Sequence, residues 1–360
     1  MVMGITNAAV GDLTNNITDY SVDTIELNSP NGMKEYSYTN TNFAQEMGYL
    51  ETIAELGSTI KAMAKWTVGK GYKASADVKD TLGKIKGWGK DSFNEIVKNA
   101  IKIYMASGDS YAEIIKDKSG KLINLKPLNA GKVAIVVDDQ GMLKRYEYSQ
   151  GEKDPIIYQP DEIFHLAWDR IGDQVHGTSI IRRLETIILM RNEAMDDMKT
   201  VFHRYVKPLW IWRLNTDKPA EIAAFKAKAD KTVTNSENIY VPMGAVEAER
   251  VSVPQYSTLD PLPWIDALNQ YFYQATNVPD VVLGSAKQTV EASAKMLIFA
   301  FEQSVQEHQL FLEEQIKLQL GLEVNFEFPA SIATDITDDQ KKDGKPTASQ
   351  PNDTTAGSGK

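Results

Sequence analysis

The strongest helical pattern in the chain lies between Thr178 and Tyr205, and it limits the folds that the chain can adopt. Thr178 or Ser179 can cap its start after Gly177, and Lys207-Pro208 ends it. About 27 residues at 1.5 Å each reach about 40 Å, which is unusual inside a compact domain. The pattern therefore predicts a helical strut, with a stripe at three- and four-residue steps formed by Ile180, Ile181, Leu184, Ile187, Ile188, Ala194, Met195, Met198 and Phe202.

A small insert and two further helices are predicted after the strut. Asp260-Pro261 begins the first helix, with Asp at the cap and Pro at the first helical position, and Val278-Pro279 breaks it after Asn277. A polar loop then runs to about Ala292. The insert is predicted to contain strands over Leu209–Leu214, near Ile239–Val241 and over Val246–Val253, and a helix over Ala220–Lys231. The C-terminal part is predicted to contain a long helix over Ser293–Leu320 and a strand over Val324–Phe328.

The first half of the chain mixes helices with strands. One amphipathic helix is predicted from Phe43 to Val68, stopped by Gly69-Lys70-Gly71, and a second from Asp91 to Ser107. Residues 1–42 read as an arm with short strands at most, and residues 335–360 as a disordered tail. We find no internal repeat. The strands are predicted over Tyr111–Ile115, Leu122–Leu128, Val133–Val137, Leu143–Tyr148, Ile156–Tyr158 and Ile163–Trp168.

Composition excludes several classes of function. Lys plus Arg is 39 and Asp plus Glu is 49, so the net charge is −10, which disfavours a protein that wraps DNA over its whole surface. The absence of cysteine excludes disulfides, thiolate zinc sites, iron–sulfur clusters and cysteine nucleophiles. The N-terminus lacks a basic, apolar signal pattern, and no apolar run is long enough to span a bilayer. We therefore expect a soluble intracellular protein, or one that leaves the cell by a route other than secretion.

No catalytic constellation is apparent in the sequence. The segment Gly69–Ala74 resembles a phosphate loop but follows a helix, and neither GxxxxGK[ST] nor GxSxG occurs. His165, Asp169 and His176 can be drawn as a metal triad, which keeps open a metal-dependent nuclease or phosphoesterase. The alternative interpretation of these residues is a packed strand followed by a loop that docks the next helix. We expect no cofactor and no metal.

Basic residues alternate with acidic ones along the strut. Such mixed charge is typical of inter-subunit ion pairs and equally of a solvated helix face. The basic residues that we single out are Arg182, Arg183, Arg191 and Lys199.

Five short motifs, in this order over about residues 44–325, resemble those of portal proteins, the rings at one vertex of tailed double-stranded DNA viruses. The stretch Ala275–Gly284, ATNVPDVVLG, resembles the family's helix end, Val-Pro break and following loop most closely. The others are Ala106-Ser107-Gly108-Asp109-Ser110-Tyr111 with Glu113-Ile114-Ile115, Leu125-Lys126-Pro127-Leu128, Asp161-Glu162-Ile163-Phe164-His165-Leu166, and Val175-His176-Gly177-Thr178-Ser179-Ile180.

The resemblance implies an α+β fold with a mixed α/β wing and two long antiparallel stem helices flanking a small α/β clip. A further long helix follows a tunnel loop, and little sequence beyond Leu320 remains for a crown. The implied divisions are 1–43 arm, 44–177 wing, 178–205 first stem helix, 206–258 clip, 259–278 second stem helix, 279–292 tunnel loop, 293–334 wing or short crown helix, and 335–360 tail.

The same resemblance implies a non-enzymatic conduit for packaging and ejecting DNA. Its partners would be further copies in a dodecameric ring, the major capsid protein, the large terminase subunit, the head–tail adaptor and the double-stranded DNA in the channel, with no membrane. It would lie in the virion, and in the host cytoplasm during assembly. Another virion structural protein, such as a tail adaptor, is a further alternative. The implied functional residues are Lys287, Gln288 and Thr289 at the channel, and Trp210, Trp212, Lys226 and Lys228 for docking at the clip.

Overall fold

The computed structural model describes residues 24–28, 34–206, 210–235, 246–250, 262–284 and 291–328. The chain divides into two compact units. The first unit comprises Met1–Arg183 and Phe272–Lys360, and the second comprises Leu184–Tyr271. Both boundaries fall inside helices, α6 (Ile180–Val206) and α8 (Leu262–Ala275), and each unit is described by itself below.

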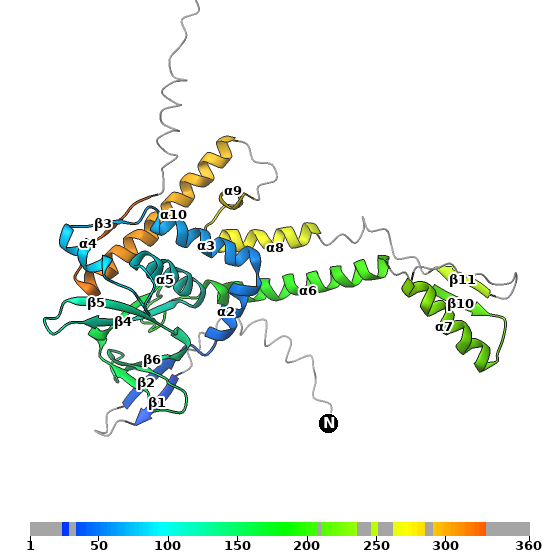
Figure 1. The fold of residues 1–360 in the computed structure, drawn as a ribbon, viewed down its shortest axis with the longest axis horizontal. Coiled ribbons are helices and arrows are strands. Elements are labelled where there is room, and N and C mark those ends of the chain that lie inside the picture. Colours follow the sequence, from blue (N-terminus) through cyan, green and yellow to red (C-terminus); the bar gives the residue numbers. More distant parts are fainter. Residues whose placement is uncertain are drawn as a thin grey trace, which may run out of the picture. The chain divides into compact units, whose positions relative to one another are not determined.

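The helices of the first unit surround the start of a small sheet (Figure 1). The single helix predicted over 43–68 is wrong, because the chain is extended at Ile53 (φ −95°, ψ 102°), where a β-branched side chain is buried. The short helix α4 was not predicted at all. The helices are α2 (Phe43–Thr52), α3 (Ala54–Val68), α4 (Ala76–Gly83), α5 (Phe93–Ser107), α9 (Asp280–Leu283) and α10 (Glu291–Leu320).

A three-stranded antiparallel sheet carries three of the resemblance motifs, one on each strand. Its order is β5 (Leu122–Leu128), β4 (Asp109–Lys116), β9 (Ile163–Ala167), with Tyr111 opposite both Leu128 and His165. Gln319 of α10 covers the outer edge of β9, because its side chain bonds both the N–H and the C=O of His165 (2.8 and 2.6 Å). Asp109, the first residue of the central strand β4, is buried.

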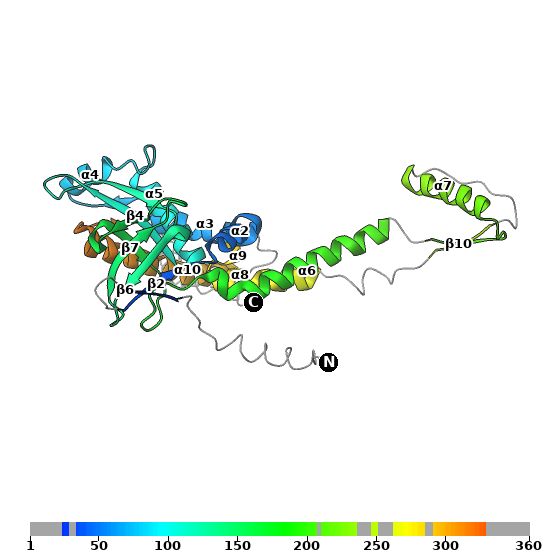
Figure 2. The ribbon, with the colours of Figure 1, turned by 90° about the horizontal axis from the view of Figure 1, so that it is seen from below.

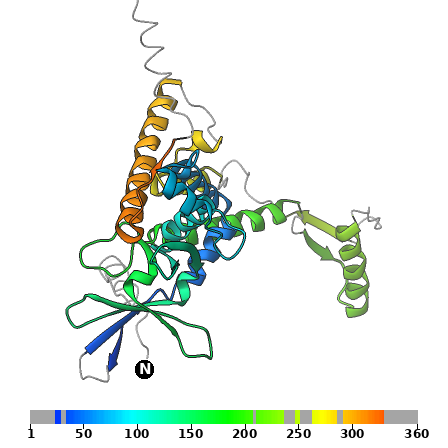
Figure 3. The same cartoon turned by 60° about the vertical axis from the view of Figure 1, so that its left-hand side comes forward.

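A second, five-stranded sheet packs against the first through an apolar cluster that includes Tyr111, Ile135, Tyr146 and Ile163. Figure 3 shows its β1–β2 hairpin below the helices. Residues 34–39, which the sequence assigned to an arm, are a strand of this sheet because Tyr36 and Tyr38 pack on the cluster. The strand order is β1 (Thr24–Asn28), β2 (Lys34–Thr39), β6 (Val133–Val137), β7 (Leu143–Tyr148), β8 (Ile156–Tyr158).

The long helix α10 packs against α3 and the edge strand β9 of the first unit. Phe301 meets Trp66 of α3 edge-on, with ring centroids 5.4 Å apart, and Gln309 donates to the carbonyl of Thr67 at 2.8 Å. After Gly321 the chain forms β12 (Asn325–Phe326), which pairs with β3 (Tyr72–Lys73). The strand predicted near the end of the apolar sequence is therefore present but shorter, and it ties the end of α10 back to the start of the helical layer.

The second unit contains a helix pair and a small α/β element. Helices α6 and α8 run antiparallel and side by side (Figures 1 and 2), and Arg191 of α6 donates to Asn269 of α8 at 2.9 Å. Strands β10 (Trp210–Leu214) and β11 (Val246–Arg250) pair, and α7 (Pro219–Asn235) packs on them through Phe225 and Trp212, 5.4 Å apart. The strand predicted near Ile239–Val241 lies outside the described residues. Among the described residues, no helix is long and apolar enough to cross a membrane.

Candidate functional site

A buried carboxylate joins three separate segments at the start of α6. Asp109, the first residue of β4, accepts from His165 Nε2 at 2.9 Å, from His176 Nδ1 at 2.7 Å and from the Gly177 N–H at 3.1 Å. A carboxylate only accepts, so each of these ring nitrogens carries a hydrogen. We call Asp109, His165, His176 and Gly177 the joint. It connects β4, β9 and the loop that leads into the long helix.

Backbone contacts reinforce the joint. Trp168 donates its N–H to Gly108 at 3.0 Å and accepts from the Thr178 N–H at 2.8 Å. A Cβ on Gly177 would lie 2.6 Å from the backbone N and O of Trp168, and still closer to the carbonyl of Gly108. Only glycine allows so close an approach of two backbones. The Ser179 hydroxyl donates to the carbonyl of Ala106 at 2.5 Å and accepts from the N–H of the third helical residue, capping α6.

The joint is electrostatically self-consistent near neutral pH. Burial alone would raise the pKa of Asp109, but hydrogen bonds from His165 and His176 outweigh it, so that pKa lies well below its usual range. Burial lowers the pKa of His165 despite the attraction of Asp109. Neutral His165 is satisfied on both sides, because Tyr146 donates to Nδ1 at 3.1 Å while Nε2–H donates to the carboxylate. The Asp109 carboxylate therefore stays ionised in the core, where hydrogen bonds from both histidines and from the Gly177 N–H stabilise it.

An aromatic stack holds the loop from its other side. Trp168 stacks on His308 of α10, with ring centroids 4.0 Å apart, and on Tyr104 of α5 at 5.6 Å. The Tyr104 hydroxyl lies 2.9 Å from Nδ1 of His308, and burial lowers the pKa of His308 to about 4. A neutral imidazole accepts the hydroxyl hydrogen. The loop between β9 and α6 is thus held by buried histidines on both sides.

The metal triad drawn from the sequence is wrong. His165 and His176 come together as proposed, but the carboxylate between them is Asp109, whereas Asp169 pairs with Arg183 at 2.5 Å. Over the described residues, no group of three or more His, Cys, Asp or Glu side chains is arranged to hold a metal ion. The other interpretation of this stretch, a packed strand and a loop that docks the next helix, matches the contacts.

The four basic residues singled out on the strut have different surroundings. Arg191 is buried and donates to Asn269 of α8 within the same chain. Arg183 binds Asp169, and Arg182 lies near the buried carboxyl of Glu46. Lys199 is exposed.

Large apolar side chains remain exposed on α6. Met195 and Phe202 follow Ile188 at seven-residue steps, so the three side chains lie on one face of the helix. Ile188 is fully buried, whereas Phe202 is 59% exposed. Leu189 is 55% exposed on a different face of the helix.

The ATNVPDVVLG segment ends α8 with a defined cap. Asn277 has a positive φ of 52°, and the N–H of buried Val278 donates to Tyr273 at 3.0 Å, five residues back, as in a Schellman motif. The polar loop was predicted to run to about Ala292; its first residues, Asp280–Leu283, form α9 instead, and α10 begins at Glu291, close to the predicted end of the loop. Lys287, Gln288 and Thr289 lie outside the described residues.

The proposed clip residues sit on the α/β element of the second unit. Trp212 is half-buried against α7, and Lys226 and Lys228 are exposed on that helix. Trp210 lies in β10, opposite Arg250. Phe225, which packs on Trp212, was not singled out from the sequence. A large apolar residue among alanines and lysines indicates the buried face of a helix, and this pattern could have identified it.

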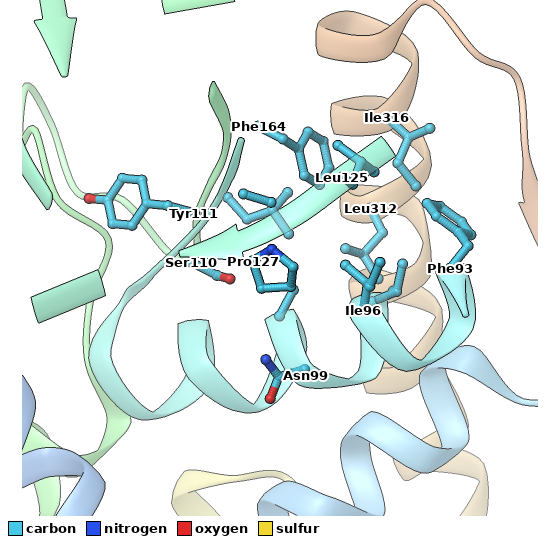
Figure 4. Close-up of a pocket in the computed structure, with 14 residues that line it drawn as sticks. Phe93, Ile96, Asn99, Ser110, Tyr111, Leu125, Pro127, Phe164, Leu312 and Ile316 are labelled. Carbon is cyan, nitrogen blue, oxygen red and sulfur yellow. The ribbon is translucent and has the colours of Figure 1, made fainter. Parts of the chain in front are cut away.

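A small pocket lies in the core, where α5 and α10 pack against the three-stranded sheet (Figure 4). Its walls are almost entirely apolar, and most of its side chains are buried. Asn99 and Ser110 are the polar residues at its margin. Such a lining offers few groups to a polar ligand. The labelled apolar residues are Phe93, Ile96, Tyr111, Leu125, Pro127, Phe164, Leu312 and Ile316.

Comparison with solved structures identifies the class of protein that this fold defines. A chain from the virion of a native gene transfer agent particle superposes with a TM-score of 0.65 at 15% identity, covering 93% of this chain and 94% of that one. A chain from the neck of the native particle, computed with C12 symmetry, gives 0.65 at 16% identity and 92% and 93% coverage. An HK97-family phage portal protein from Corynebacterium diphtheriae gives 0.52 at 12% identity and 80% and 97% coverage.

The family model of phage portal proteins matches residues 90–342, more than half of the chain. A comparison with curated proteins gave no match. The chain belongs to the phage portal protein family.

Proposed function

We propose that this chain is the subunit of a closed ring at one vertex of a virus particle, through which double-stranded DNA is packaged and ejected. The family match over residues 90–342 carries this proposal. The similar neck structures were computed with C12 and C6 symmetry, which supports a homo-oligomeric ring, with twelve copies as the working number. The ring would lie in the virion, and in the host cytoplasm while the particle assembles.

The parts of the portal are assigned to the units as follows. The wing would comprise residues 34–177 and most of α10, since strand β2 joins its sheet. Helices α6 and α8 would be the stem, and the element β10–α7–β11 the clip. The segment between α9 and α10 would be the tunnel loop, and residues 293–334 leave room for a short crown at most.

Lateral contacts in such a ring need two different, complementary surfaces on each copy, because the interfaces of a ring are heterologous. The exposed apolar residues Met195 and Phe202, which share one face of α6, are candidates for one of these surfaces. Their burial by a neighbouring copy would be favourable by roughly 1.5–3 kcal/mol for each side chain fully covered.

A conduit has to let DNA slide. Each phosphate that a protein neutralises adds to its affinity, so a ring of chains that each carry −10 would provide a largely repulsive wall. Lys287, Gln288 and Thr289 would make weak local contacts with the duplex. Trp210, Trp212, Lys226 and Lys228 would dock the large terminase subunit and then the head–tail adaptor. The major capsid protein would surround the wing.

We propose a structural role without catalysis, in which ATP hydrolysis belongs to the terminase. The nuclease alternative loses its support with the metal triad, because both histidines are committed to Asp109. A tail adaptor remains the alternative within the virion, and no described contact favours it.

Sedimentation velocity of stem variants tests the ring. Met195→Asp and Phe202→Asp place charges on exposed positions of one face of α6, so each monomer should stay folded while the ring weakens. Glu193→Gln, at an exposed position on the opposite side of the same helix, is the matched control and should sediment like the wild type. Rings that form equally well in all three variants would show that this face of α6 is not an interface.

The tunnel-loop assignment has its own experiment. Lys287→Ala with Gln288→Ala should leave ring assembly intact and change DNA packaging or retention in particles. Failure of ring formation itself would contradict the assignment.

A further inference from the structure

A single tryptophan stands out on the surface of the first unit. Trp88 is 72% exposed, in the turn over residues 84–91 that connects α4 to α5. Tryptophan carries the largest apolar surface of any side chain, so an exposed tryptophan lacks the favourable free energy that burial of its ring would give. The residues that flank the turn, Ile85 and Phe93, are both buried. The exposure of Trp88 is therefore specific to the tip of an otherwise well-packed connection.

The turn is fixed in place by one side chain of the neighbouring sheet. Asn124 of β5 accepts from the N–H groups of Lys86 and Gly87 at 3.1 and 2.9 Å and donates to the carbonyl of Gly87 at 2.6 Å. The carbonyl of Lys86 also accepts from Gly89 at 2.7 Å and from Asp91 at 3.1 Å. Gly87 and Gly89 have φ of 57° and 137°, which other residues rarely adopt. The backbone thus presents Trp88 in one conformation before any partner arrives.

Positive charge surrounds the exposed ring. Residues 84–91 contain three lysines and one aspartate, in a chain whose net charge is −10. Lys84 pairs with Asp80 at 2.6 Å, and the carboxylate of Asp91 lies against Gly87. Lys86 and Lys90 are exposed and make no ion pair with any residue in the described part of the chain. Two available cations therefore flank the tryptophan on a rigid turn.

We propose that Trp88, Lys86 and Lys90 form a docking knob for a protein of the surrounding shell, whose surface offers an apolar pocket bordered by carboxylates. Exposed tryptophans that fill a pocket dominate protein interfaces, and a rigid turn loses little entropy on binding. The lysines select carboxylates by charge complementarity. DNA is a poorer fit, since two lysines supply at most two phosphate contacts against the repulsion of an acidic chain. The inference rests on the proposed function, which places the wing next to the shell.

The test is a binding titration with the purified major shell protein of the same virus as the probe. The chain has no cysteine, so one cysteine introduced at Gln150, exposed on the β7–β8 turn, takes a fluorescent label. Trp88→Ala should weaken binding at least tenfold. Lys86→Glu with Lys90→Glu should weaken it and flatten its salt dependence. Met142→Ala, which removes another apolar side chain that is 65% exposed, is the matched control and should bind like the wild type.

Three outcomes would overturn the proposal: equal binding by Trp88→Ala and the wild type, equal loss in Met142→Ala, or Trp88-dependent binding of a 30-base-pair duplex or of phosphatidylserine vesicles but not of the shell protein. Light scattering on the same samples reports the ring separately. A sample that forms no ring argues against the proposed function, whereas a ring that binds the shell protein without Trp88 argues against the knob alone.

Discussion

Asp109→Asn tests whether the joint holds the start of α6. Asparagine keeps the shape of the side chain but replaces one acceptor oxygen with an NH₂ group. If its oxygen stays with His165 and Gly177, its NH₂ faces the hydrogen on His176 Nδ1. Moving that hydrogen to Nε2 would let the NH₂ donate to Nδ1, but it would bury an N–H donor at Nε2, which has no hydrogen-bond partner among the described residues. The variant therefore either loses the His176 bond or buries an unpartnered N–H group, and it weakens the other two bonds.

The expected cost follows from these bonds. A hydrogen bond to a charged group contributes about 1.5–3 kcal/mol, and a neutral acceptor makes a bond about half as strong. Losing the His176 bond and weakening those of His165 and Gly177 should lower the free energy of unfolding by about 3 kcal/mol. For a unit of this size that corresponds to a melting temperature lower by about 6–12 °C.

Chemical denaturation followed by tryptophan fluorescence measures the change, because Trp168 lies beside the joint. Asp161→Asn, in which an exposed aspartate is replaced, is the control and should change stability by no more than about 0.5 kcal/mol. A loss in Asp109→Asn no larger than that of the control would refute the reasoning, since the carboxylate would then contribute nothing beyond its shape.

Three further predictions concern the buried groups around the two sheets and α10. Burial lowers the pKa of His308 to about 4, below its unfolded value near 6.5. The contribution of neutral His308 to the free energy of unfolding should therefore be fully present above pH 6.5, and about 3 kcal/mol of it should be lost as the pH falls to 4. Unfolding curves measured every half pH unit should show this slope, and His308→Gln should remove it. Gly177→Ala should be among the most destabilising single changes, because its Cβ meets backbone on two sides; circular dichroism melting at or near the wild-type temperature would contradict this. Glu35, bonded to Lys144 and Arg145, has its pKa lowered to about 2 by those hydrogen bonds, so its contribution is present above pH 4.5 and is lost as the pH falls toward 2. In Glu35→Gln this part of the acid dependence should be missing, and an unchanged acid profile would count against the ion pair.

The sequence predicted the long elements well because their signal is local. The stripe from Thr178 to Tyr205 repeats over many turns, and the observed helix spans Ile180–Val206. The strand expected over Leu209–Leu214 is observed as Trp210–Leu214. Periodicity of this kind depends on residues three or four apart, so it survives without knowledge of the rest of the fold.

The breaks in these elements depended on distant contacts. Ile53 fits a helical pattern, and only the burial of its side chain between packed helices explains why the chain is extended there. Strand β2 was missed as part of the wing because residues 34–39 gain their partner, β6, from a segment much further along the chain. Local propensity carries no information about such pairings.

The joint shows the same limit at the level of side chains. Gly108-Asp109, His165 and His176-Gly177 were each noticed, in three of the motifs that carry the family resemblance. Nothing in their spacing says that they meet, and the sequence paired the histidines with the nearby Asp169 instead of Asp109. The sequence brought the two histidines together correctly, but the carboxylate between them comes from the start of β4, a distant strand that precedes both histidines in the chain.

The mass of the purified assembly, by light scattering with negative-stain images of the same fraction, tests the central claim most directly. Twelve copies of a 40.1 kDa chain give a particle of about 480 kDa, and the account predicts that mass with a central hole. A copy number one unit away would still be a closed ring. A stable species with the 40.1 kDa mass of a single chain, at high protein concentration and in several salts, would contradict the account.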